Sequence, residues 1–149
     1  MIKLINSIVK ESCDLKNTFT DEIDAAVNYC CIFSQSDNEF CELKRLANKI
    51  GKVVEETLSG PLYQIDPVET VSGLLKLLKI RNPDETKPER GDADFTVRNY
   101  HVFKDKYLSS SNFKLILKDD FEMIELMESG FTVRAYFSYP PLDDQFGLN

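Results

Sequence analysis

Hydrophobic positions in the first twenty residues recur with the spacing of a helix. Ile2, Ile5, Val9 and Cys13 lie three or four residues apart, which is typical of an amphipathic helix with one apolar stripe. We therefore predict an N-terminal helix within residues 1–20. Such a stripe suits a helix packed on its own domain, and it equally suits an arm that forms a dimer.

The following segment, residues 21–81, shows the pattern of one strand, one helix and three strands. Residues 24–33 are rich in β-compatible side chains and predict a buried strand. Ser36 and Glu39 form a capping-box pattern that starts a helix, and Gly51 is predicted to end it as a left-handed cap. Three further strands are predicted at residues 52–57, 61–65 and 74–81.

Residues 82–91 hold prolines, a glycine and several charged residues, and predict a solvated linker whose KPERG part can border a pocket. Beyond it, residues 92–138 repeat the strand, helix and three-strand pattern, with Asn99 as the helix cap. The three strands are predicted at residues 113–119, 121–129 and 131–138, as an antiparallel meander. Residues 139–149, with a double proline, are predicted to form a tail on the surface or on a partner.

Composition narrows the classes of function. With 149 residues, 42% of them hydrophobic, the chain is predicted to be a single domain spanning residues 1–149. Its net charge of −7 disfavours nucleic acid and acidic membrane surfaces as partners. Its apolar stretches are too short to cross a bilayer. The four cysteines do not suggest a disulfide framework, so we expect a cytoplasmic protein with reduced thiols.

Two successive βαβββ units indicate an internal repeat, and the second opens with GDADFTVRNYHVFKDKYL. This organisation resembles the vicinal oxygen chelate superfamily, which includes glyoxalases, bleomycin-resistance proteins and extradiol dioxygenases. The resemblance covers roughly residues 24 to 138. It implies an α+β fold in which tandem βαβββ modules form curved, mixed or antiparallel sheets around a ligand cavity, here with an added N-terminal helix.

The resemblance also implies metal ligands early on the first strand and late on the last strand of each module. Asp92 stands at one such place, whereas the first module has only Asn28 or Cys30 on a plausible inward face. The last strands carry cationic side chains, at Lys76, Lys79 and Arg81 in the first module and at Arg134 in the second. Cations do not ligate metals, so we expect neither a metal site nor a cofactor.

Alternation along the strands of the second module predicts a polar face. Ala93, Phe95 and Val97 share one face of their strand, and Val133, Ala135 and Phe137 share one face of theirs. The opposite faces and the neighbouring strand supply six candidate ligand-binding residues: Asp92, Asp94, Thr96, Glu125, Arg134 and Tyr136.

In this prediction the Arg134 guanidinium pairs with a ligand carboxylate or phosphate, and Asp92 or Asp94 acts as an acceptor or base. Whether Glu122 or Glu125 lies nearby depends on the strand register. The alternative is a solvated sheet face whose ion pairs contribute little to stability.

Two functions of different classes follow. The first is a protein that binds a small anionic organic molecule, or a lyase- or isomerase-like enzyme that acts on one. The second is a non-enzymatic homodimeric interaction module with a filled or solvated sheet face. The pattern assigns no catalytic residue, and a ferredoxin-like fold remains an alternative if the strands are miscounted.

Overall fold

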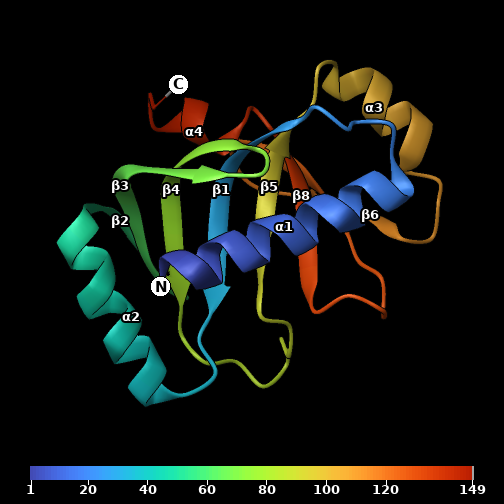
Figure 1. The fold of residues 1–149 in the computed structure, drawn as a ribbon. Coiled ribbons are helices and arrows are strands. Elements are labelled where there is room, and N and C mark those ends of the chain that lie inside the picture. The colour runs from blue at the N-terminus through green and yellow to red at the C-terminus, as the bar shows by residue number, and fades with distance from the viewer. Residues whose placement is uncertain (149) are drawn as a thin grey trace.

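The computed structural model describes residues 1–148 as four helices and an open eight-stranded mixed sheet (Figure 1). The N-terminal helix α1 spans Ile2–Phe19. The first module comprises β1 Ala26–Phe33, α2 Asp37–Ile50, β2 Gly51–Thr57, β3 Gly60–Thr70 and β4 Gly73–Arg81. The second comprises β5 Gly91–Thr96, α3 Tyr100–Tyr107, β6 Phe113–Leu117, β7 Glu122–Leu126 and β8 Val133–Tyr139, and a short helix α4 follows at Leu142–Gln145.

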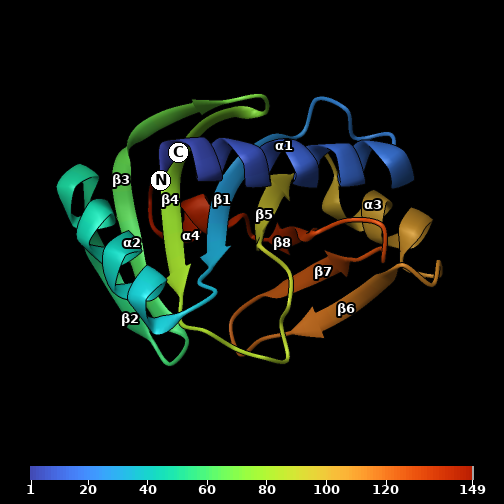
Figure 2. The same ribbon diagram turned by 60° about the horizontal axis from the view of Figure 1, so that its bottom comes forward.

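The strand order is β2-β3-β4-β1-β5-β8-β7-β6. In each module the last strand pairs in parallel with the first, β4 with β1 and β8 with β5. All other strand pairs are antiparallel. The modules meet where β1 and β5 pair, and β2 and β6 lie at opposite edges of the sheet (Figure 2). The predicted α+β architecture of tandem βαβββ units with an added N-terminal helix is confirmed.

Helix α1 covers one face of the sheet across β1, β5 and β8 (Figure 1). The apolar stripe of α1 is buried because the apolar faces of β5 and β8 lie against it. In addition, the Ser12 hydroxyl donates a hydrogen bond of 2.9 Å to the Arg134 carbonyl. Phe137 also contacts Phe103 of α3, with ring centroids 4.4 Å apart. The face assignment made from alternation is therefore correct for the second module: its apolar side chains are in the core.

The sequence predicted how α2 begins and how it ends, and only the first of these predictions is correct. The Ser36 hydroxyl accepts a hydrogen bond of 3.1 Å from the Glu39 backbone, as predicted, while the Glu39 carboxylate accepts one from the Gln35 backbone at 2.8 Å. The prediction for Gly51 is wrong. Its φ of −169° is extended, and it is the first residue of β2. Glycine is needed there because a Cβ atom would lie 2.2 Å from the Gln64 carbonyl oxygen.

The chain after β8 leaves the sheet, as the double proline predicts. Residues 142–145 then form α4, and Leu142, Gln145 and the following Phe146 line the open face of the sheet. Within residues 1–148, no helix has the length and apolar character needed to span a membrane.

Candidate functional site

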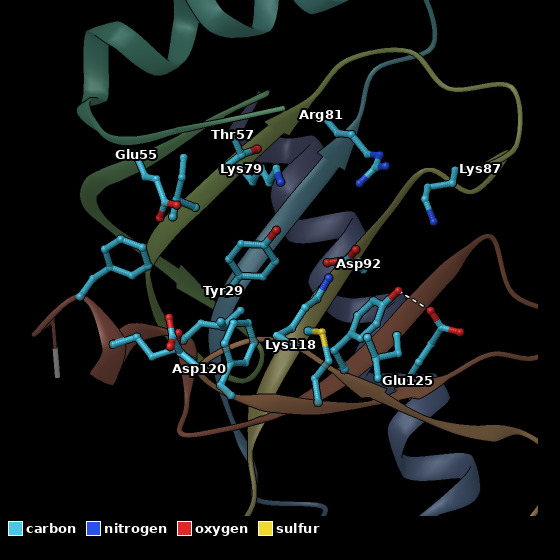
Figure 3. Close-up of a pocket in the computed structure, with 18 residues that line it drawn as sticks. Tyr29, Glu55, Thr57, Lys79, Arg81, Lys87, Asp92, Lys118, Asp120 and Glu125 are labelled. Atoms are coloured by element: carbon cyan, nitrogen blue, oxygen red, sulfur yellow. Dashed lines mark hydrogen bonds between the residues drawn. The ribbon is translucent and has the colours of Figure 1, made fainter. Parts of the chain in front are cut away.

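The face of the sheet opposite α1 is hollowed into a cavity of about 670 Å³ (Figure 3). Both modules contribute to its wall: β1, β2, β3 and β4 from the first, and β5, β6, β7 and β8 from the second. Helix α4 covers part of it. Such a volume is within the range of pockets that hold small organic molecules.

Four cationic side chains from three places point into this cavity. Lys79 and Arg81 come from β4, Lys87 from the linker and Lys118 from the turn after β6 (Figure 3). Arg81 approaches Asp84 at 3.5 Å, and in residues 1–148 the Lys79 ammonium forms no hydrogen bond or ion pair. Lys79 is half-buried, and burial lowers its pKa because the charged form loses hydration. This ammonium is available to a ligand anion.

Asp92 lies among these cations on β5. Its side chain is 7% exposed, and its Oδ1 atom is buried without a hydrogen-bond partner in the described chain. Burial, followed by the charge of Asp94, raises the pKa of Asp92 to about 7, although the charges of Arg134, Lys79 and Arg81 oppose the shift. Both protonation states of Asp92 are therefore populated near neutral pH.

Glu125 on β7 joins two side chains of β8. Its Oε2 atom accepts a hydrogen bond from the Tyr136 hydroxyl at 2.6 Å and one from Arg134 Nη1 at 3.1 Å. Arg134 also donates from Nε and Nη2 to the two carboxylate oxygens of Glu89, at 3.0 and 3.1 Å. Its guanidinium is thus held by two carboxylates and contributes to the wall behind Tyr136.

Asp94 and Thr96 belong to a separate buried cluster. Asp94 Oδ1 accepts hydrogen bonds from Asn28 Nδ2 at 3.0 Å and from the Ser138 backbone at 3.1 Å, and the Ser138 hydroxyl donates to Oδ2. Asn28 Nδ2 also donates to the Thr96 hydroxyl at 3.0 Å. Burial raises the pKa of Asp94 to about 6, and these hydrogen bonds oppose the increase. The cluster does not line the cavity.

The structure thus brings three of the six candidate residues to the cavity: Asp92, Glu125 and Tyr136. Asp94, Thr96 and Arg134 share their sheet face but lie outside the cavity lining, where protein groups already hold their polar atoms. The register that the sequence left open is settled, since Glu125 pairs with Tyr136. Glu122 instead accepts from the Tyr100 hydroxyl at 2.7 Å.

Sequence reasoning missed Lys79, Arg81 and Lys118 as ligand-facing groups, although the alternation in LLKLLKIR places Lys79 and Arg81 on one face. It also missed Tyr29. A register shift between Val27 and Tyr29 interrupts the alternation along β1. Asn28 and Tyr29 both lie on the polar side, whereas Cys30 is in the core under α1 and not on the inward face.

A divalent cation, which the resemblance to the chelate superfamily implies, does not fit the side chains at this place. Around Asp92, the neighbouring strands present the phenols of Tyr29 and Tyr136 and the ammonium of Lys79. Residues 1–148 contain no group of three His, Cys, Asp or Glu side chains that can hold a metal ion. A single carboxylate facing a lysine is a poor donor set for a hard cation, which prefers several oxygen ligands.

Comparison with known proteins supports the fold. No protein-family model and no curated protein matches the sequence. Among solved structures, a structural-genomics protein designated EC4020 superposes with a TM-score of 0.68 over 90% of this chain and 82% of its own, at 8% identity. A glyoxalase/bleomycin resistance protein/dioxygenase superfamily member from Vibrio splendidus 12B01 superposes with a TM-score of 0.52 over 76% and 97%, at 10% identity. The chain therefore has the vicinal oxygen chelate fold.

Proposed function

We propose that this protein binds a small organic anion in the cavity on the open face of its sheet. The observation that carries the proposal is the ammonium of Lys79, which faces a 670 Å³ cavity without a protein partner in the described chain. Arg81, Lys87 and Lys118 add positive charge around the same cavity. In a partly dehydrated site, such charges attract a carboxylate or phosphate more strongly than on an exposed surface.

The rest of the wall suits an organic molecule rather than a bare ion. Leu62, Ile116, Met123 and Phe146 supply apolar surface, while Tyr29 and Tyr136 supply phenols. A cavity with an apolar wall and a few placed polar groups is typical of sites for small metabolites.

The test is a titration of the full-length protein with a panel of small carboxylates, oxalate, malonate and citrate, at constant ionic strength. Thermal stabilisation reports binding because a ligand that binds only the folded state raises its stability. We expect Lys79→Met to weaken binding by at least about tenfold, which corresponds to roughly 1.4 kcal/mol. Lys114→Met is the matched control, because Lys114 is an exposed lysine on β6 outside the cavity lining.

If no carboxylate stabilises the wild-type protein, or if the two lysine variants bind equally well, the proposal is wrong. The alternative function, a homodimeric interaction module, stays a prediction, and sedimentation equilibrium tests it directly.

A further inference from the structure

Asp92 and Asp94 lie two residues apart on the same face of β5, yet their hydrogen bonding differs. Both are buried. Asp94 accepts hydrogen bonds from Asn28 and Ser138, whereas Asp92 Oδ1 has no partner in the described chain. A buried carboxyl group without hydrogen bonds is costly, and its persistence calls for an explanation. Asp92 also lines the cavity, whereas Asp94 does not.

The neighbours of Asp92 leave it without a dedicated counterion. Arg134, on the adjacent strand β8, already binds Glu89 and Glu125. On the other side, β1 presents uncharged groups, the Tyr29 phenol and the thiol of Cys31, which pairs with Asp92, and burial raises the pKa values of both. The other titratable or charged groups that influence Asp92 or line the cavity are Lys79, Arg81, Asp94, Tyr136, Glu125, Lys118, Lys87, Glu55 and Asp120.

An anion bound beside Lys79 also lies near Asp92, because both residues pair with Cys31 of the strand between them and both side chains line the same cavity. An ionised Asp92 would repel that anion, and it would offer only acceptors to a ligand oxygen that itself accepts. A protonated Asp92 removes the repulsion and supplies an O–H donor. Protonation costs little here because burial already disfavours the charged form.

We propose that the ligand carboxylate lies between Lys79 and Asp92, and that Asp92 binds it in the protonated form as a hydrogen-bond donor. This inference rests on the proposed function and deepens it. It assigns Asp92 a role in specificity for anions and makes anion binding take up one proton. The ligand carboxylate thereby receives one charged donor, from the Lys79 ammonium, and one neutral donor, from Asp92.

The experiment is isothermal titration of the full chain with oxalate from about pH 5.5 to about pH 8.5 at fixed ionic strength, a range in which oxalate stays fully ionised. We expect the affinity to be constant at the acidic end and to fall towards about tenfold per pH unit above the pKa of Asp92. The heat of binding should also vary with the ionisation enthalpy of the buffer, because one proton is taken up.

The Asp92→Asn variant distinguishes a protonated Asp92 that donates a hydrogen bond from an ionised Asp92 that accepts one. An amide is a permanent neutral donor, so the variant should bind oxalate at alkaline pH as tightly as the wild type does at acidic pH. Lys79, whose pKa burial lowers, can also weaken binding at high pH, but that dependence would persist in Asp92→Asn. Asp120→Asn is the control, since Asp120 is an exposed acid of the same cavity, and the wild-type dependence on pH should remain.

Affinity that rises with pH, or an Asp92→Asn variant that binds weakly at every pH, would show that Asp92 acts as an ionised acceptor and would overturn the inference. If binding requires Lys79 but does not change with pH, the inference about Asp92 is also wrong, while the proposed function stands. If no carboxylate binds the wild-type protein, the proposed function fails and this inference fails with it. Should Asp92→Asn not fold, ¹³C NMR titration of the Asp92 carboxyl group with and without oxalate decides, because the inference requires the pKa of Asp92 to rise on binding and an unchanged or lowered pKa would overturn it.

Discussion

The Tyr136 hydroxyl and the Arg134 guanidinium donate to the same oxygen of Glu125, at 2.6 and 3.1 Å. Arg134 also binds Glu89, so a single buried cation holds two carboxylates behind the cavity wall. Burial lowers the pKa of Arg134, but its interactions with Glu89 and Tyr136 outweigh this effect and raise the pKa above its usual value. We interpret Arg134 as the organiser of this wall.

Arg134→Met should therefore destabilise the protein by about 3 kcal/mol, because it leaves two carboxylates unpaired in a partly buried place. Urea unfolding measures the change. Arg45→Met is the control: the Arg45–Glu42 pair lies on the exposed surface of α2, and its loss should change stability little. Equal stability of the two variants would contradict the role assigned to Arg134.

Asp92→Asn should change the dependence of stability on pH. The folded-state pKa of Asp92 is raised to about 7, above the value of about 4 expected in the unfolded chain. Between these values the folded protein retains a proton that the unfolded chain has lost, so wild-type stability falls as pH rises through this window.

Across this pH window, Asp92 changes the free energy of unfolding by on the order of 4 kcal/mol at most. The neutral asparagine removes it, so we expect Asp92→Asn to be more stable than wild type at pH near 8 and similar to it near 4. A shallower fall should remain in the variant because the pKa of Asp94 is also raised, to about 6. Thermal melts across pH measure both curves, and identical slopes would refute the assignment.

Asn28→Ala should weaken the buried cluster around Asp94. Asn28 donates to Asp94 and Thr96 at 3.0 Å, so its removal costs the carboxylate a hydrogen bond and raises the pKa of Asp94 further. We expect a loss of about 2 kcal/mol, measured by urea unfolding, and a shift of the Asp94 carboxyl titration in ¹³C NMR to higher pH. Asn38→Ala, at an exposed position of α2, should change neither. An unchanged Asp94 titration would contradict this account.

Gly91→Ala should destabilise the junction of the two modules. A Cβ atom at Gly91 would lie 2.3 Å from the Cys31 carbonyl oxygen and 2.8 Å from Ile8 Cδ1, so β1 or α1 would have to move. We expect a loss of at least about 2 kcal/mol in denaturant unfolding. Gly130→Ala provides the matched control, since nothing lies within 4 Å of its Cβ position. Comparable stability of the two variants would show that β1 and β5 tolerate a wider separation.

Much of the architecture was accessible from local pattern. The capping residue Ser36, the Asn99 cap of α3 and the apolar faces of β5 and β8 follow from side-chain chemistry and from the period of two along a strand. These features depend on neighbours close in sequence, and the structure bears them out. The repeat of element order in turn predicted the tandem modules.

The composition of the site depended on contacts between distant segments. A register shift in β1 places Tyr29 in the cavity and Cys30 in the core, although simple alternation predicted the reverse for Cys30. Pairing of β5 with β8, together with the approach of Glu89, determined that Arg134 is held by the protein while Asp92 is left without a partner.

By itself, the sequence determined the order of the strands and helices and the apolar faces of β5 and β8, because periodicity and capping are local properties. Only the tertiary structure decided which polar side chains have partners and which face an open cavity. The physical reason is that hydrogen bonding and dehydration of Lys79, Asp92 and Arg134 depend on atoms contributed by strands far apart in the chain.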